Sequence, residues 1–364
     1  MSNPSELLRG VPLIESPLFA QSLDSMDLSE QERETAVQLN QRGYAVIDFP
    51  DPHLDARIDR IKANLVARFG DRLMDPESIK NTGDLRVQDA WRSDEDVKAI
   101  AANSEVIALL SKLYGRKAFP FQTLNFPVGT QQQKHSDAVH FSSQPERFMC
   151  GVWLAMEDIK AEAGPLCYCP GSHKWPIISN AMIGRRGWNS SAHSAQSPFE
   201  RVWEALVDAS GIQEEIFLAR KGQALIWTAN LLHGGSVQTD PRLTRWSQVT
   251  HYYFDDCIYY TPAFSDEPLG KLDLRSIIDI ASGEIKPNTL LGEPATPVSS
   301  SKPLSFLARL GRRFRPKAKL QDLPDDFDSE AYYRLNPDVL AEGDDAASHY
   351  LNHGRLEGRR YRAD

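Results

Sequence analysis

Beyond Gly115 the chain consists of short runs of β-branched and aromatic residues, and this pattern limits the fold more than any other feature. Glycine and proline separate the runs, which are AFPFQTLNF, HSDAVHF, MCGVWLAMED, GPLCYCPGSH, EEIFLAR, QALIWTANLLHGG and RWSQVTHYYF. Strands of this length and spacing, with one longer interruption, are typical of a sandwich or a jelly-roll barrel rather than of βαβ units. We therefore predict an α+β protein with a mainly β core.

Helices are predicted before this core and once inside it. The segment SEQERETAVQLNQRG can be capped by Ser29 and ends at Gly43, and YAVIDF after it predicts a strand. LDARIDRIKANLVARFG and VKAIAANSEVIALLSKLYG carry apolar residues at helical spacing, and each ends at a glycine. The interruption, about residues 176–212, contains SPFERVWEALV, whose spacing predicts an inserted helix.

Four parts are predicted along the chain. They are an irregular N-terminal segment (1–30), a large jelly-roll domain (31–265), an extended basic linker (266–323) and a small helical tail (324–364). In the linker, seven basic residues and no acidic one lie between Lys302 and Lys319. This run, residues 302–319, is either a solvated linker or a peripheral contact with an anionic membrane or a phosphate-rich partner.

Composition argues against several classes of protein. With 50 acidic and 41 basic residues the net charge is −9, which disfavours a nucleic-acid scaffold. No stretch approaches about 18 consecutive apolar residues, so we expect neither a transmembrane segment nor a signal peptide. The four cysteines form no CxxC pair. We interpret them as buried free thiols of a reducing compartment, which makes the cytoplasm the expected location.

Two groups that can bind a metal ion lie in the run HSDAVHF. If this run is a strand, His135 and Asp137 point to the same face, because residues i and i+2 of a strand do so. One more imidazole would complete the two-histidine, one-carboxylate triad that binds Fe(II) and leaves positions open for an oxoacid and O2. His233 is the candidate, since it ends an apolar run and precedes two glycines that let backbone approach a bound group.

The run RLTRWSQVTHYYF adds a group suited to a carboxylate ligand. Arg245 and His251 are six residues apart and share one face of the predicted strand. A guanidinium beside a metal site can hold the distal carboxylate of an oxoacid through paired hydrogen bonds. His251 either lines the same cavity or is a buried core histidine.

Four blocks in the same order resemble the phytanoyl-CoA dioxygenase family, over roughly residues 40–255. They are QQKHSD, GVWLAMEDIKAEAGPLCYCPGSHK, ALIW followed by LLHGGS, and TRWS. The resemblance implies a double-stranded β-helix (jelly roll) with N-terminal helices, which binds Fe(II) and uses 2-oxoglutarate as cosubstrate. It implies metal ligands at His135, Asp137 and His233. For 2-oxoglutarate it implies an anchor for the C5 carboxylate at Arg245, with further contacts from Ser236, Trp153 and Gln122, and it leaves His140 open.

The family resemblance also implies the class of reaction. A substrate carbon is oxidised, most simply by hydroxylation, while 2-oxoglutarate and O2 become succinate and CO2. Related halogenases carry a small residue in place of the metal carboxylate, and here that carboxylate is Asp137. We therefore expect hydroxylation or another oxidation, with no side-chain general base.

The remaining charged and histidine residues of the core receive simpler interpretations. His173 in PGSH is expected to be a turn residue that bonds backbone, and His193 a solvated residue of the insertion. Arg185 and Arg186 are either an exposed charge pair or a grip for an anionic group of the substrate.

The tail FDSEAYYRLNPDV…HYLNHGRLEGRR resembles a short module of bacterial proteins associated with glycosyltransferases and surface-polysaccharide assembly. Asp328 can cap the first of two short helices. The tail is either an appendage or a contact with a glycan-biosynthesis protein. In the latter case we expect the substrate to be a sugar, a glycolipid or a modifying group of a cell-surface glycan, and otherwise a small molecule or a glycan-linked or lipid-linked one. Two other functions stay open: a non-redox jelly roll that binds Zn or Mn, as an isomerase or a sugar-binding module, and a non-catalytic adaptor.

Overall fold

In the computed structural model, the strand-rich region forms two antiparallel sheets that face each other. The structure describes residues 4–69, 85–188, 190, 195–295, 323–324, 326–336, 346–350 and 360–362. The chain divides into two units, Met1–Val298 and Ser299–Asp364. Each unit is described by itself.

The larger sheet has six strands in the order β1-β8-β5-β10-β3-β2, and the smaller has three in the order β7-β6-β9. The strands of the larger sheet are β1 Tyr44–Asp48, β2 Val87–Gln88, β3 Ala118–Phe126, β5 Met149–Ala155, β8 Gln223–Thr228 and β10 Ser247–Phe254. Those of the smaller sheet are β6 Leu166–Tyr168, β7 Glu215–Phe217 and β9 His233–Gly235. A further pair joins β4 Ser142–Gln144 to β11 Ile258–Tyr260.

Both faces of the larger sheet are buried, and successive side chains along its central strands point alternately to the two faces. Trp153 of β5 and Leu225 of β8 pack in the cluster between the two sheets, with residues from β6 and β7. Their neighbours Val152 and Ile226 point the other way, into the cluster that the helices cover. This arrangement is the double-stranded β-helix (jelly roll) that the sequence predicted.

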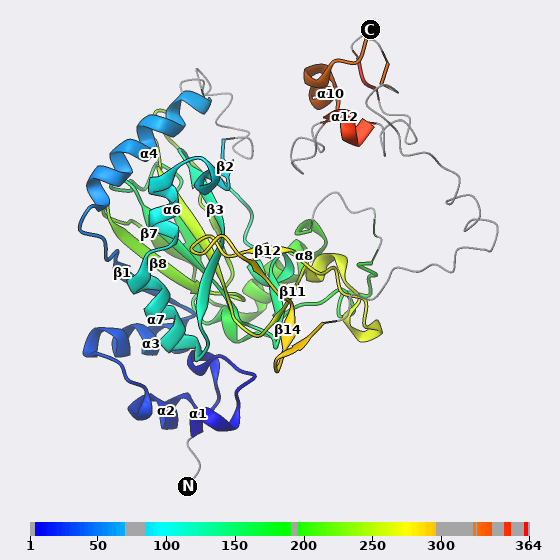
Figure 1. Cartoon of the computed structure of the whole chain (residues 1–364). Coiled ribbons are helices and arrows are strands. Elements are labelled where there is room, and N and C mark those ends of the chain that lie inside the picture. The colour runs from blue at the N-terminus through cyan, green and yellow to red at the C-terminus, as the bar shows by residue number, and fades with distance from the viewer. Residues whose placement is uncertain are drawn as a thin grey trace, which may run out of the picture. The chain divides into compact units, whose positions relative to one another are not determined.

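Helices cover the outer face of the larger sheet (Figure 1). They are α3 Glu30–Arg42, α4 Leu54–Phe69, α6 Glu95–Ala101 and α7 Ser104–Tyr114. The start of α3 is the predicted cap, in which the Ser29 hydroxyl accepts from the Glu32 N–H while the Glu32 carboxylate accepts from the Ser29 N–H. Gly43 ends α3 at φ 84°, and a Cβ there would lie 2.5 Å from His173 Nδ1, so only glycine fits.

Two stretches before the core differ from expectation. VKAIAANSEVIALLSKLYG forms two helices rather than one, because the Asn103 side chain accepts from two backbone N–H groups and starts α7 anew. The N-terminal segment, expected to be irregular, contains the short helices α1 Pro4–Leu7 and α2 Phe19–Ser22. Its apolar residues Ile14, Phe19 and Leu23 are buried in the main core, which holds the segment in place.

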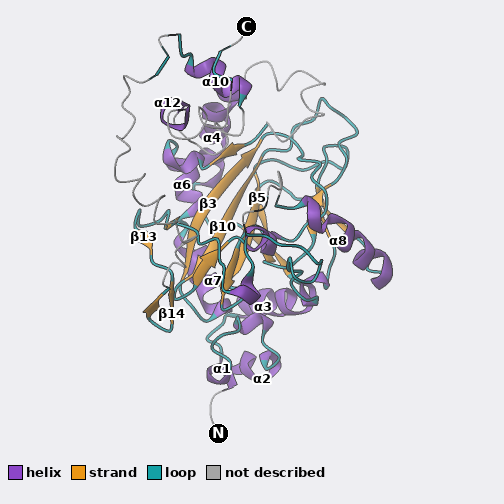
Figure 2. Ribbon diagram, turned by 90° about the vertical axis from the view of Figure 1, so that its right-hand side faces the viewer, coloured by secondary structure: helices purple, strands orange, loops and turns teal. Residues whose placement is uncertain are grey.

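The inserted helix is α8 Ser197–Ser210, and it lies across the strands from α4 and α6 (Figure 2). Its Phe199 and Trp203 are buried against Val139 and Leu232. These two partners lie close in sequence to the histidines and the aspartate that the sequence singled out. The insertion therefore packs beside the predicted metal site.

Residues 266–295 do not form the extended linker that was expected. They contain the hairpins of β12 Ile277–Ile278 with β13 Ile285–Lys286 and of β14 Thr289–Leu290 with β15 Glu293–Pro294. Ile277 is buried in the main core, and the Ile280 N–H donates to the Pro120 carbonyl at 2.9 Å. The apolar residues of this stretch therefore fix it to the larger unit. The basic run 302–319 lies outside the described residues.

The smaller unit contains α10 Ser329–Leu335 and α12 Ala346–His349. The carboxylate of Asp328 accepts from two backbone N–H groups and caps α10, as predicted. Phe327, Tyr332, Tyr350 and Tyr361 pack together in its core. No helix in the described part of the chain is both long enough and apolar enough to cross a membrane.

Candidate metal centre and its pocket

A pair of backbone hydrogen bonds brings two histidines from distant parts of the chain face to face. The His135 N–H donates to the His233 carbonyl at 2.9 Å, and the His233 N–H donates back at 3.0 Å. The two imidazole centroids are 4.5 Å apart. The sequence expected His135, Ser136 and Asp137 in one strand. Only His135 pairs as a strand does, because the chain then turns into a 3-10 helix, Asp137–Val139.

The two glycines after His233 have a different role from the one expected. A Cβ at Gly234 would lie 2.7 Å from the Gln132 carbonyl oxygen, and one at Gly235 would lie 2.7 Å from Thr130 Oγ1. The glycines thus let residues 130–134 lie directly on β9, whereas the sequence suggested approach to a bound group. This contact sets the position of His135, which follows the segment immediately.

Backbone carbonyls fix the orientation of both imidazoles. His135 Nδ1 is 2.9 Å from the Gln133 carbonyl, and His233 Nδ1 is 3.0 Å from the Leu231 carbonyl. Because a carbonyl can only accept, each Nδ1 carries the proton and each Nε2 has a free lone pair. His135 Nε2 lies 3.7 Å from Asp137 Oδ1, and His233 Nε2 lies 3.8 Å from Asp137 Oδ2. One possible ligand atom from each of the three residues lies within 4.8 Å of the other two. All three side chains are buried.

An indole and a third histidine hold the Asp137 carboxylate. Trp227 Nε1 donates to Asp137 Oδ2 at 2.8 Å, and His251 Nε2 lies 3.6 Å from the same oxygen. Trp227 can lie across β5 only because residue 151 is glycine, where a Cβ would be 2.2 Å from the indole. His251 Nδ1 in turn contacts Gln122 Oε1 at 3.0 Å, its cross-strand partner on β3. Of the two roles expected for His251, the structure therefore favours a residue that lines the cavity over a buried core histidine.

Burial and neighbouring charges shift the pKa values of His135 and Asp137. Burial, with the neighbouring His233, lowers the pKa of His135 to about 3. Burial alone would raise the pKa of Asp137, but the nearby His233 and His251 lower it well below its ordinary range. At neutral pH the cluster therefore offers a neutral imidazole at His135 and an ionised carboxylate, the donor types of a ferrous site.

The cluster lines a cavity of about 240 Å³ that also contains a buried guanidinium. Arg245 is 2% exposed, and its Cζ lies 5.6 Å from the Trp153 ring centre. No acidic side chain in the described part of the chain pairs with it, and its Nε has no hydrogen-bond partner. Trp153 Nε1 is likewise buried without an acceptor. Both residues line the cavity that holds His135, Asp137 and His233, and both side chains carry donors that suit a carboxylate ligand.

The other predicted residues divide into those at the cavity and those away from it. Gln122 and His140 line it, with the His140 ring centre 5.9 Å from that of His135. Ser236 is not among the lining residues, and its buried Oγ has no hydrogen-bond partner. His173 Nε2 contacts the Asn40 carbonyl at 3.1 Å, so it bonds backbone as predicted.

The two arginines of the insertion are engaged within the protein rather than at the cavity. Arg186 pairs with Asp266 at 2.7 Å, and Arg185 donates to Asn180 and Ser190. His193 lies outside the described residues. All four cysteines are free and buried, as predicted.

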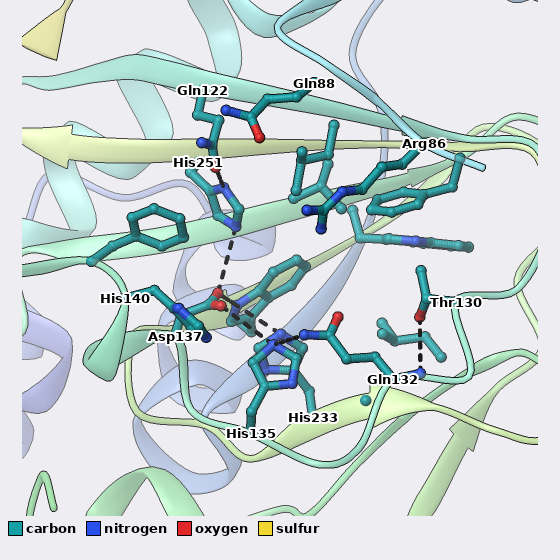
Figure 3. Close-up of a pocket in the computed structure, with 18 of the residues that line it drawn as sticks. Arg86, Gln88, Gln122, Thr130, Gln132, His135, Asp137, His140, His233 and His251 are labelled. Carbon is teal, nitrogen blue, oxygen red and sulfur yellow. Dashed lines mark hydrogen bonds and ion pairs between the residues drawn. The ribbon is translucent and has the colours of Figure 1, made fainter. Parts of the chain in front are cut away.

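Sequence reasoning missed several residues of the pocket. Gln132 Nε2 lies 3.4 Å from His135 Nε2 and donates to Gln196 Oε1 of the insertion at 2.9 Å. Arg86, directly before β2, and Gln88, in β2, line the side of the pocket opposite His135 and His233, as Figure 3 shows. The alternation in QALIWT was the one available signal for Trp227. Gln132 belongs to the block QQKHSD and is three residues before His135, but its side chain was not singled out; Arg86 and Gln88 have no metal-binding residue among their sequence neighbours.

The family model described as phytanoyl-CoA dioxygenase matches residues 27–242, more than half of the chain. The chain belongs to the phytanoyl-CoA dioxygenase family. A comparison with curated proteins gives no match. For this family member, membership and the His–Asp–His cluster together support Fe(II)- and 2-oxoglutarate-dependent oxygenase activity.

Three solved structures can be set beside this phytanoyl-CoA dioxygenase family member. SnoK, a non-heme α-ketoglutarate-dependent carbocyclase from nogalamycin biosynthesis, is 17% identical over 67% of this chain and 91% of its own, with a TM-score of 0.49. The epimerase SnoN, in complex with Fe3+, α-ketoglutarate and nogalamycin RO, is 17% identical over 73% of this chain and 96% of its own, with a TM-score of 0.48. EctD from S. alaskensis, with 2-oxoglutarate and 5-hydroxyectoine, is 17% identical over 74% of this chain and 88% of its own, with a TM-score of 0.49.

Proposed function

We propose that this protein is an Fe(II)- and 2-oxoglutarate-dependent hydroxylase. The observation that carries the proposal is the buried, unpaired Arg245 in the same cavity as the His135, Asp137 and His233 cluster. A structural arginine buried this deeply normally pairs with a carboxylate of its own protein. The lack of one among the described residues supports a ligand that brings the carboxylate with it.

The metal-ligand roles follow from the three side chains of the cluster. His135 and His233 would bind Fe(II) through Nε2, since each Nδ1–H is engaged by a carbonyl, and Asp137 would bind through its carboxylate. Fe(II) held there with 2-oxoglutarate would supply O2-dependent oxidation of a substrate carbon, with formation of succinate and CO2. The Trp227 indole keeps the Asp137 carboxylate in place through its 2.8 Å hydrogen bond.

The cosubstrate-binding residues form the second part of the proposal. Arg245 would pair with the C5 carboxylate of 2-oxoglutarate, and Trp153 Nε1 would donate to the same ligand. Gln122 would contact it through the amide group that now contacts His251. Ser236 remains a proposed contact, because its buried hydroxyl has no hydrogen-bond partner among the described residues.

Hydroxylation is favoured over halogenation because the carboxylate of Asp137 occupies the position that a halide would need. We further propose that the substrate is a small molecule or a glycan-linked or lipid-linked molecule. Contact of the C-terminal unit with a glycan-biosynthesis protein, contact of residues 302–319 with a membrane and residence in the cytoplasm all stay predictions. The four unpaired cysteines are consistent with the cytoplasm.

An oxygen-free titration tests the proposal. The protein loaded with Fe(II) should develop a visible charge-transfer band when 2-oxoglutarate is added, and admission of air should produce succinate. His135→Ala should lose the band through loss of metal, while His53→Ala, which alters an exposed histidine outside the site, should keep it. A folded protein without band or succinate contradicts the proposal. Tight Zn or Mn binding in that case would favour the non-redox isomerase or sugar-binding module.

The product distinguishes hydroxylation from other oxidations once a substrate is found. Hydroxylation adds one oxygen atom that comes from O2. Epimerisation leaves the mass unchanged, and oxidative ring closure removes two hydrogens. A substrate screen read by succinate release, with nucleotide sugars, acyl thioesters and amino acids, would supply the compound to analyse.

A further inference from the structure

The turn between β8 and β9 contacts the residues around all three proposed metal ligands. The Ala229 carbonyl accepts from the Ala138 N–H at 3.1 Å and from the Ser136 hydroxyl at 3.2 Å. Ser136 lies between the histidine and the aspartate of the first two ligands. The Leu231 carbonyl contacts Nδ1 of His233 at 3.0 Å. The position of this turn therefore decides where the ligand atoms meet.

The Asn230 side chain fixes this turn to a neighbouring segment, and it is 5% exposed. Its Nδ2 donates to the Trp175 carbonyl at 2.8 Å and to the His173 carbonyl at 3.4 Å. Its Oδ1 accepts from the Ser136 hydroxyl at 3.0 Å. Because carbonyls only accept, these partners admit one orientation of the amide. Asn230 does not line the cavity, so it acts on the metal ligands only through the residues that it holds.

A largely buried ion pair holds the other end of this contact. Arg147 Nη1 donates to the His173 carbonyl at 2.8 Å, and its Nη2 donates to the Trp175 carbonyl at 3.0 Å. The same guanidinium pairs at 2.6 Å with Glu15 of the N-terminal segment, whose side chain is 4% exposed. Arg147 has φ 72°, a left-handed conformation that residues other than glycine keep only where their surroundings fix it. A continuous path of polar contacts thus runs from Glu15 to Ser136.

The hydrogen bonds along this path distinguish support of the site from support of the fold. If Asn230 is replaced, the carbonyls of residues 173 and 175 keep their hydrogen bonds to Arg147. Buried carbonyls that keep a partner cost little free energy. What is lost is the link between the turn and the segment that carries these carbonyls, together with the acceptor that orients the Ser136 hydroxyl. The substitution therefore acts on the ligand geometry more than on the stability of the protein.

We propose that Asn230 is a positioning residue of the metal centre and that Arg147 and Glu15 extend this support to the N-terminal segment. The inference rests on the proposed function, because it assumes that the His–Asp–His cluster binds a metal ion. Residues that hold metal ligands through hydrogen bonds typically contribute about 10-fold to 100-fold to metal affinity. Asn230 acts one residue further away, through Ser136 and the turn, so we expect the lower end of that range.

Co(II) is the probe for the test, because its visible spectrum reports the arrangement of its ligands and needs neither 2-oxoglutarate nor O2. The affinity of the full-length, metal-free protein for Co(II) is measured by competition with a chelator. Asn230→Ala should lower this affinity by about tenfold and change the spectrum of the saturated site. Ser136→Ala, which removes only a hydroxyl, should act in the same direction and add little to Asn230→Ala in the double variant. Glu15→Gln should cause a smaller loss, because its side chain is farther from the ligands.

Asn180→Ala is the matched control. Asn180 is also buried, and its Nδ2 donates to the carbonyls of Pro262, Ala263 and Ser265, none of which lines the cavity. Its replacement should lower the urea midpoint of unfolding at least as much as Asn230→Ala does. It should nevertheless keep the Co(II) affinity within about twofold, because distant sites act independently.

The inference is wrong if Asn230→Ala and Ser136→Ala keep the Co(II) affinity and spectrum of the unaltered protein. It is also wrong if Asn180→Ala loses as much affinity, since affinity would then follow stability alone. An unchanged affinity in Glu15→Gln would overturn the part that concerns the N-terminal segment.

Failure of the proposed function has a different signature. The unaltered protein would then bind Co(II) and respond to these substitutions, yet form no succinate with Fe(II), 2-oxoglutarate and air. An unaltered protein that binds no Co(II) would contradict both.

Discussion

Replacing Arg245 by methionine should stabilise the metal-free protein while it removes cosubstrate binding. Arg245 is 2% exposed and has no acidic partner among the described residues, and burial lowers its pKa to about 10 from the ordinary 12.5. A pKa lowered by about 2.5 means that burial disfavours the charged form by about 3 kcal/mol. The substitution also removes the favourable contact of the guanidinium with the Trp153 ring, which cancels about 1 kcal/mol of this gain in stability. The variant should therefore gain about 2 kcal/mol in its free energy of unfolding, or roughly 4 °C in Tm.

Binding of 2-oxoglutarate should change in the opposite direction. Removing one partner of a buried charge pair costs about 2 to 5 kcal/mol, so affinity should fall from about 30-fold to a few thousand-fold. The affinity is measured by oxygen-free titration of the Fe(II)-loaded protein, and the stability by thermal unfolding of the metal-free protein.

Arg147 supplies the matched control, because it is an arginine with partners. It pairs with the buried Glu15 at 2.6 Å and donates to the carbonyls of His173 and Trp175. Arg147→Met should therefore lose about 3 to 5 kcal/mol of stability. If Arg245→Met is destabilised to a similar degree, or binds 2-oxoglutarate within threefold of the unaltered protein, the assignment of Arg245 as a carboxylate anchor is wrong.

Three further changes test how the site is built and supported. Trp227→Phe removes the donor to Asp137 and should weaken metal binding by about 10-fold to 100-fold in a chelator competition; unchanged affinity would contradict the role of the indole. Gly151→Ala places a Cβ 2.2 Å from the same indole. The variant should lose about 1 to 3 kcal/mol of stability in urea unfolding, and it should also bind metal more weakly. If stability and metal affinity are both unchanged, Trp227 moves freely and is not held by Gly151. His173 has a pKa lowered to about 4, mainly by burial, so the unfolded chain takes up the proton first as the pH falls below about 6.5. The contribution of neutral His173 to the free energy of unfolding is therefore present above pH 6.5 and is lost as the pH falls toward 4. In urea unfolding at several pH values, His173→Gln should remove up to about 3 kcal/mol of this pH dependence. If the variant loses stability in acid as steeply as the unaltered protein does, this explanation is wrong.

Much of the local structure was predictable because short-range rules decide it. The capping box at Ser29, the αL end at Gly43 and the inserted helix with Phe199 and Trp203 all depend on residues within one or two turns. The same rules failed at Asn103, where one amide side chain interrupts an apolar periodicity that otherwise continues. They also failed for residues 266–295, whose packing depends on contacts with strands far away in the sequence.

The ligand types were recognisable from the sequence, but their arrangement was not. His135 and Asp137 are two residues apart, and the resemblance supplied His233 and Arg245. The expected strand geometry was wrong, since Asp137 starts a 3-10 helix, and the ligand atoms meet because His135 pairs with His233 through backbone hydrogen bonds. No local pattern encodes that pairing between residues almost a hundred positions apart.

By itself, the sequence determined the class of fold, the chemical types of the metal ligands and the family. The tertiary structure decided the rest: that Gly151 makes room for Trp227, and that the buried Arg245 meets no carboxylate among the described residues. The physical reason is that strand alternation and helix caps are set by neighbours in the chain. Whether a charge finds a partner depends on which distant segments fold beside it.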